Sequence, residues 1–187
     1  TGQRGWSEED NAAWGFIYNT QTEEYTLLSS DLYENGSSYG INNQGIAVGW
    51  VDDLPLGTVR MPALFYPDGT IELINGEVQG EAAEINDNNM VVGEMGGELF
   101  IYNIQTEELT TFPLMGDYFS GSFTDIALNG VVIGYLTKFI EDEGFYRDAI
   151  IYHPQLGENP VFLADVLTEH GVDVTSFSGT AYKISPN

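Results

Sequence analysis

The sequence has no cysteine among its 187 residues, and only 5 lysine and arginine residues stand against 29 aspartate and glutamate residues. The lack of cysteine excludes disulfides, thiolate metal sites and a cysteine nucleophile. The net charge of −24 argues against nucleic acid or an anionic membrane surface as a partner, because phosphate contacts need lysine and arginine. No apolar run is long enough to cross a bilayer, so direct membrane insertion is not expected.

Signatures of catalysis are also missing. The sequence has no HExxH, no GxSxG and no glycine-rich phosphate loop that opens a helix. The two histidines, His153 and His170, lie apart in the sequence, and nothing among the many carboxylates singles out one pair for glycoside hydrolysis. We therefore predict that the protein is not an enzyme.

What the sequence does contain is a repeated hairpin. Residues 40–50 (GINNQGIAVGW) recur as residues 84–94 (EINDNNMVVGE) and 125–135 (DIALNGVVIGY). Each copy has an isoleucine, a polar turn, a β-branched run and then a glycine, a pattern that predicts strand, tight turn and strand. One such unit cannot bury its apolar face alone, so several are expected to pack together.

The spacing of the repeats predicts the fold. The isoleucines that precede the turns are separated by 44, 41 and 58 residues. These anchors are Ile41, Ile85, Ile126 and Ile184. We predict one all-β domain over residues 1–187, a β-propeller-like fold of four blades, each of about four antiparallel strands. The alternative is a β-sandwich of many short strands. In the propeller, the anchor isoleucines face the core, and a set of tyrosines takes like positions in successive blades: Tyr18, Tyr66, Tyr102 and Tyr152.

Further strands are predicted over residues 14–19, 25–28, 62–66, 98–103, 149–153 and 161–163. Residues 29–38 are predicted to form a loop rich in serine, asparagine and glycine.

The two ends of the chain resemble the two halves of one hairpin. Residues 181–187 (AYKISPN) supply its first half, and residues 1–8 (TGQRGWSE) its second half.

We therefore expect Gly5 and Trp6 to pair with Ala181, Tyr182 and Ile184. The N-terminal strand would then complete the last blade, and closure would remove an exposed sheet edge. Closure within one chain gives a ring, whereas pairing with a neighbouring chain gives head-to-tail assembly. A third interpretation is that the chain is a piece of a longer array.

The motif resembles the HAF-type extracellular repeats of bacteria and related uncharacterised repeat proteins of marine bacteria. Residues 39–49 with 63–66 match best, and residues 83–93 with 99–102 follow. The third copy departs at Ala127 and Leu128, and the fourth at Ser185 and Pro186. The resemblance implies an exported, propeller-like protein of the cell surface or extracellular space, and it offers no catalytic residues.

The sequence contains candidate groups for two kinds of ligand. Acidic clusters fall in connections between strands, where they either are solvated or bind Ca²⁺. The clusters are Glu8-Glu9-Asp10, Asp52-Asp53 and Glu141-Asp142-Glu143. Trp6, Trp14 and Trp50 are candidates for stacking on carbohydrate, although the equivalent repeat positions of Trp6 and Trp50 favour packing.

These observations predict a non-catalytic extracellular structural or adhesive module that assembles with itself through the N-terminal strand. The second hypothesis is a propeller that binds cell-surface carbohydrate or Ca²⁺.

Overall fold

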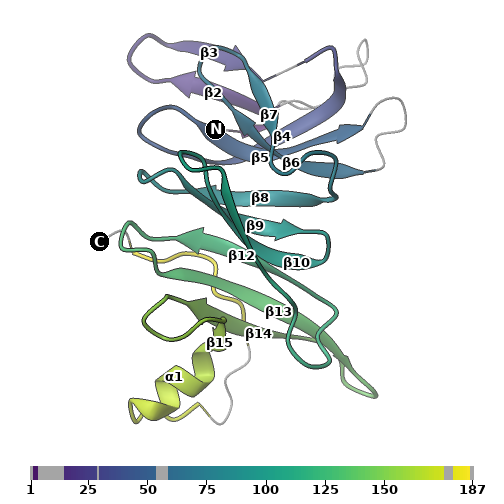
Figure 1. Cartoon of the computed structure of the whole chain (residues 1–187), viewed down its shortest axis with the longest axis vertical. Coiled ribbons are helices and arrows are strands. Elements are labelled where there is room, and N and C mark those ends of the chain that lie inside the picture. Colours follow the sequence, from purple (N-terminus) through teal and green to yellow (C-terminus); the bar gives the residue numbers. More distant parts are fainter. Residues whose placement is uncertain (1, 4–14, 29, 54–58, 175–178, 186–187) are drawn as a thin grey trace.

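A computed structural model describes residues 2–3, 15–28, 30–53, 59–174 and 179–185. In these residues the chain forms antiparallel strands in four sheets, with one short helix near the C-terminal end (Figure 1). Within each sheet the strands follow one another in sequence order. The prediction of an all-β fold is confirmed, and the described strands form four antiparallel sheets.

The first sheet contains β1 (Gly2–Gln3), β2 (Gly15–Asn19) and β3 (Glu24–Leu27). The second contains β4 (Tyr33–Ile41), β5 (Ala47–Asp53), β6 (Arg60–Phe65) and β7 (Ile71–Leu73). The third contains β8 (Gly80–Ile85), β9 (Met90–Met95), β10 (Glu98–Asn103) and β11 (Glu108–Phe112). The fourth contains β12 (Ser120–Ile126), β13 (Val132–Ile140), β14 (Gly144–Tyr152) and β15 (Val161–Phe162), and α1 (Leu163–Glu169) follows.

The sheets pack one on the next. The first contacts the second through β4, the second contacts the third through β8, and the third contacts the fourth through β12. A cluster of buried apolar side chains lies at each of these junctions. In Figure 1 the four sheets succeed one another along the long axis, with the first sheet at one end and α1 at the other. In the described residues, no strand of the first sheet pairs with the fourth sheet or with residues 179–185.

A shared irregularity explains the glycine of the motif. The opening strand of each complete sheet shifts register at the same place and so leaves Tyr39, Ala83 or Thr124 without a partner residue. Each bulge brings a backbone carbonyl close to the second strand. A Cβ atom on Gly93 would lie 2.1 Å from the carbonyl oxygen of Glu81, and those on the equivalent glycines of β5 and β13 would lie 1.8 and 2.3 Å from a carbonyl oxygen. Only glycine fits there without a shift of the backbone.

Several boundaries differ from those predicted. The expected loop over residues 29–38 is wrong from Tyr33 onward, where β4 begins. The strand expected over residues 161–163 ends at Phe162, and α1 follows because its sequence, LADVLTE, contains leucine, alanine and glutamate, which favour helix. His170 lies at the C-terminal end of this helix.

The tyrosine prediction is partly wrong. Tyr102 and Tyr152 do take like positions, opposite Val91 and Val132 on the neighbouring strands. In the second sheet this position belongs to Phe65, and Tyr66 lies one residue beyond the end of β6. A phenylalanine and a tyrosine adjacent in the sequence made both alignments fit the pattern, and only the strand register decides between them. Among the described residues, no helix has the length and apolar character needed to cross a membrane.

Candidate functional site

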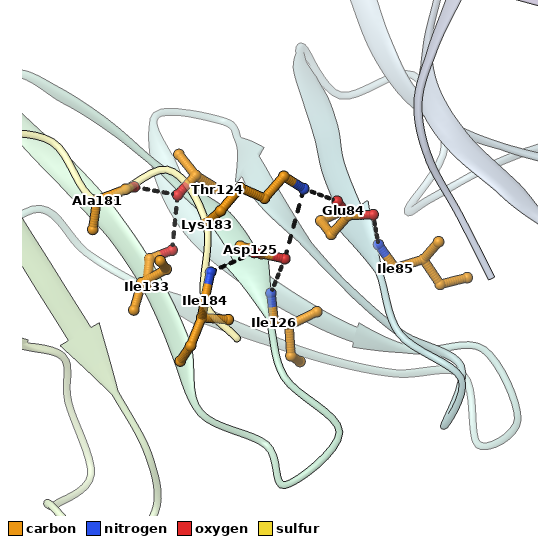
Figure 2. Close-up of polar contacts among 9 residues, drawn as sticks. All are labelled: Glu84, Ile85, Thr124, Asp125, Ile126, Ile133, Ala181, Lys183 and Ile184. Carbon is orange, nitrogen blue, oxygen red and sulfur yellow. Dashed lines mark hydrogen bonds and ion pairs between the residues drawn. The ribbon is translucent and has the colours of Figure 1, made fainter. Parts of the chain in front are cut away.

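The C-terminal segment lies against the fourth and third sheets, as Figure 2 shows. Residues 179–185 belong to no sheet, yet they run beside β12. The Thr124 hydroxyl lies within hydrogen-bonding distance of the Ala181 carbonyl oxygen (2.5 Å) and of the Ile133 carbonyl oxygen (3.3 Å). The backbone N–H of Ile184 donates to a carboxylate oxygen of Asp125 (2.7 Å). The bulge at Thr124 therefore provides the hydroxyl that holds residues 179–185, which we call the tail.

Charged residues stand immediately before three of the four anchor isoleucines, and they connect the repeats electrostatically. Lys183, which holds this place in the tail, forms an ion pair with Glu84, and its ammonium nitrogen lies 3.8 Å from an oxygen of Asp125. Burial alone would lower the pKa of Lys183, but the carboxylates of Glu84 and Asp125 raise it above its usual range. In the second sheet the same place is Gly40, where an added Cβ would lie 3.1 Å from Glu84 Cα and closer still to its carboxylate. These equivalent positions therefore meet in one region.

The anchor isoleucines converge on one cavity of about 340 Å³. All four anchors contribute to its lining, together with Lys183 and residues of all three repeated hairpin turns. Ile85 and Ile126 are buried, as predicted. The prediction is wrong for Ile41, which is 38 % exposed, and Ile184 is only partly buried. The convergence places the tail isoleucine alongside its counterparts from the three complete sheets.

Side-chain amides link successive hairpin turns. The buried side chain of Asn42 donates to Asn89 Oδ1 (2.8 Å), and that of Asn86 donates to the Ala127 carbonyl oxygen (3.0 Å). Asn86 also accepts hydrogen bonds from backbone N–H groups of its own turn through its carbonyl oxygen. The asparagines thus form the turn and also bind the next repeat. Sequence reasoning assigned them to turn geometry alone.

Of the proposed closure residues, Gly5 and Trp6 lie outside the described residues. Ala181 and Ile184 contact β12, whereas Tyr182 is 61 % exposed. The pairing of the two chain ends therefore stays a prediction.

The acidic candidates for Ca²⁺ are not brought together. Asp52 is buried at the end of β5, where its carboxylate accepts from the backbone N–H of Asn35 (2.7 Å) and from the Asn35 side chain (3.1 Å). These contacts assign it a structural role. Asp53 ends the same strand, and its side chain is not described.

Glu141, Asp142 and Glu143 lie in the exposed turn between β13 and β14, on a different sheet from Asp52. Residues 8–10 lie outside the described part of the chain. Within that part, no group of three or more histidine, aspartate and glutamate side chains is placed to hold a metal ion. The Ca²⁺ hypothesis therefore gains no geometric support from the residues that suggested it.

Each described histidine contacts a backbone carbonyl oxygen. A ring nitrogen of His153 lies 3.2 Å from the carbonyl oxygen of Asn129, and one of His170 lies 2.8 Å from that of Val166. Of the tryptophans, Trp6 and Trp14 lie outside the described residues, and Trp50 is buried. Burial agrees with the packing role favoured for Trp50 over stacking on sugar.

A second cavity, of about 360 Å³, is lined mainly by the ends of β8, β9 and β12 that point away from the polar turns of the repeated hairpins. It was not predicted from the sequence. Its lining includes Tyr39, Glu81, Glu94 and Phe119. Glu81 and Glu94 are directly opposite each other on β8 and β9, so their carboxylates share one face. Burial, and then the charge of Glu81, raises the pKa of Glu94 to about 7.

No protein-family model matches the chain, and a search of curated protein sequences finds no significant match. The resemblance to HAF-type repeats therefore rests on the motif residues alone.

Proposed function

We propose that the chain is a non-catalytic extracellular structural or adhesive module that assembles head to tail. The tail of one copy and the first sheet of the next copy would together form one complete four-stranded unit. One observation carries this proposal. Residues 179–185 lie beside β12 without belonging to a sheet, and within the described residues the first sheet has three strands where each of the others has four.

The position of the tail supports its role as an opening strand. It lies next to β12 much as β12 lies next to β8, and its isoleucine joins the other three anchors around one cavity. The contacts from Thr124 and Asp125 hold it there. In Figure 1 the tail lies beside β12 near the middle of the stack, whereas the first sheet lies at one end. In the described residues no strand of that sheet pairs with the tail, and this separation favours a neighbouring chain as its partner.

Exposed apolar side chains at the two ends of the stack also favour assembly. Phe16, Tyr18, Tyr25 and Leu27 share one face of the first sheet and line a hollow there. Tyr25 is 68 % exposed. In the fourth sheet, Phe139 and Phe145 are opposite each other and exposed, with ring centroids 5.3 Å apart. Covering such surfaces would provide the hydrophobic free energy for association.

With the tail added to the first sheet, all four sheets would have four strands and could serve as propeller-like blades. The same joint made within one chain would give a closed four-bladed ring. Because a heterologous contact that does not close extends indefinitely, the joint between chains gives either a larger ring or a filament. We favour the joint between chains, and its counterpart within one chain is the outcome that the test must separate from it.

The absence of cysteine makes a cross-linking test clean. We would replace Gln3 and Tyr182 by cysteine in one chain and treat the protein with a short bismaleimide. The proposal predicts a ladder of covalent multimers on a denaturing gel. A cross-linked single chain would instead show closure within the chain. If neither product formed, the result would contradict the pairing of the tail with the first sheet. The two single-cysteine variants are the controls, since they cannot extend beyond a dimer.

A further inference from the structure

The second cavity lies at one of two equivalent sheet junctions, which differ in the side chains that fill them. At the junction between the second and third sheets, the equivalent place is filled by one connected group of side chains. The indole N–H of Trp50 donates to the Tyr39 hydroxyl (2.8 Å), and this hydroxyl lies 3.3 Å from the Glu81 carboxylate. Arg60 forms an ion pair with Glu81, and its guanidinium lies 4.2 Å from the ring centroid of Trp50.

At the next junction, between the third and fourth sheets, this group is replaced. The bulge position of Tyr39 is Ala83, the position of Trp50 is Glu94, and the position of Glu81 is Ser122. Two large aromatic side chains are thus reduced to a methyl group and a carboxylate. The cavity of about 360 Å³ lies at this place.

The arginine is missing at this junction for a structural reason. In the second and fourth sheets the strands continue far enough to hold Arg60 opposite Asp52, and Arg147 opposite Thr137. In the third sheet the hairpin between β9 and β10 turns at Gly96 and Gly97, so no residue occupies that place. In the fourth sheet, Arg147 lies over the Tyr135 ring, with its guanidinium carbon 4.5 Å from the centroid. Two of the three complete repeats thus place a guanidinium at this level, and the third leaves a carboxylate.

The carboxylate of Glu94 is not neutralised in the part of the chain that the structure describes. It has no hydrogen bond or ion pair there, and its pKa is raised to about 7 by burial and by the charge of Glu81. Glu81 already holds Arg60, so Glu94 is the acid without a cation. A cation at this site would offset both the desolvation of the Glu94 carboxylate and its repulsion by Glu81.

We propose that this cavity binds the guanidinium group of an arginine side chain presented by a partner protein. The guanidinium would pair with Glu94 and lie near the aromatic side chains of Phe119 and Tyr39, which line the cavity. A planar guanidinium suits a carboxylate and an aromatic face together, as a compact ammonium does not. The strongly acidic chain would also draw a cationic partner toward the site.

The site does not depend on how the fourth unit is completed. Its lining comes from the second, third and fourth sheets of one chain. A dilute sample is therefore expected to bind even where the chains do not associate. Failure to bind would leave the assembly proposal intact, and failure to assemble would leave this site intact.

The test uses the full chain and three blocked amino acids as probes: acetyl-arginine amide, acetyl-lysine amide and acetyl-citrulline amide. Citrulline has the shape of arginine without its charge. Calorimetric titration is expected to show saturable binding of the arginine probe, binding of the lysine probe at least threefold weaker, and none of citrulline. Equal binding of the arginine and lysine probes would show general attraction to an acidic surface and would overturn the proposal.

Two matched variants locate the site. Glu94→Gln is expected to weaken binding of the arginine probe about tenfold or more, since a charge-assisted hydrogen bond is lost. Glu158→Gln removes the same charge from an exposed loop residue and is expected to change the affinity less than twofold. Thermal melting would establish that both variants remain folded. An unchanged affinity in folded Glu94→Gln would overturn the proposal. The proposal would also be overturned if Ca²⁺ displaced the arginine probe from Glu94→Gln and from Glu158→Gln to the same extent.

A pH series gives a further readout. Binding should strengthen between pH 5.5 and 8.5 in the wild type, because a protonated Glu94 cannot pair with a cation and the proton must leave. In Glu94→Gln the affinity for the arginine probe should be independent of pH over this range. A wild-type affinity that is flat with pH would contradict the assignment of Glu94 as the pairing group.

Discussion

The junctions between the second, third and fourth sheets differ sharply from the two ends of the chain. At the inner junctions, buried apolar clusters are supplemented by amide contacts from one hairpin turn to the next. At the ends, the first sheet presents tyrosines to solvent, and the tail is held by a few contacts with β12. The same repeat is therefore satisfied by its neighbours inside the array and unsatisfied at its limits, which is typical of repeat architectures.

The largest effect should come from the core of the inner junctions. Phe100 is fully buried on β10, within the cluster between the second and third sheets. Replacing it by alanine removes apolar contacts and leaves a cavity, so Phe100→Ala should lower the free energy of unfolding by about 3–5 kcal/mol. Urea denaturation followed by circular dichroism would measure this.

The matched change at the end of the array is Tyr25→Ala, on the exposed face of the first sheet. In a dilute sample it should lower the free energy of unfolding by less than about 0.5 kcal/mol, as is usual for surface positions. A loss similar to that of Phe100→Ala would mean that this face is covered within a single chain and would break the comparison.

The next effect concerns the repeated glycine. Gly93→Ala places a Cβ atom 2.1 Å from the carbonyl oxygen of Glu81, so the hairpin must shift. We expect a loss of about 1–3 kcal/mol of stability, the usual cost of overpacking, measured by the same denaturation. Gly179→Ala is the control, since its Cβ would meet nothing within 4 Å. Equal effects of the two substitutions would contradict the close approach at the bulge.

Much of this arrangement could be predicted from the sequence, and the reasons are local. The isoleucine, the polar turn and the glycine around residues 85–93 specify a hairpin without help from the rest of the chain. The bulges could not be predicted, because the skipped residues, Tyr39, Ala83 and Thr124, share no chemical character. The glycine opposite each bulge was the one signal available.

The Glu94 cavity was missed for a different reason. It depends on which residues of separate repeats occupy equivalent places, and the bulge register and the early turn at Gly96 and Gly97 determine that equivalence. The acid clusters at Asp52 and at residues 141–143 were conspicuous in the sequence, yet one is buried in a structural contact and the other is an exposed turn.

A smaller difference in stability is expected between substitutions of a buried and an exposed asparagine in the same hairpin turn. Asn86 is buried and donates to the Ala127 carbonyl oxygen, whereas Asn88 is exposed and donates to that of Leu128 (2.9 Å). Asn86→Ala leaves buried backbone groups unsatisfied and should cost about 1–2 kcal/mol. Asn88→Ala should cost less than about 0.5 kcal/mol, because water replaces the lost contact. Thermal melting of the two variants would show whether burial makes this difference.

The smallest effect is a pH dependence at the cavity. The pKa of Glu94 is about 7 in the folded chain and 4.5 for an unperturbed glutamate. The folded state therefore binds this proton more tightly, and the free energy of unfolding should fall as pH rises from about 4.5 to about 7. Glu94→Gln should remove that part of the fall and exceed the wild type at pH 8 by on the order of 1 kcal/mol, after allowance for partial exposure. A fall in stability with pH that is identical in the variant and the wild type would assign it to other groups.

The most direct test of the divided unit is the mass of the wild-type chain in solution as its concentration rises. Assembly between chains predicts that the weight-average mass from light scattering climbs from one chain toward multimers, and that deleting residues 179–187 keeps the protein folded at the mass of one chain. A wild type that stays at the mass of one chain from dilute to concentrated solution would contradict assembly through the chain ends.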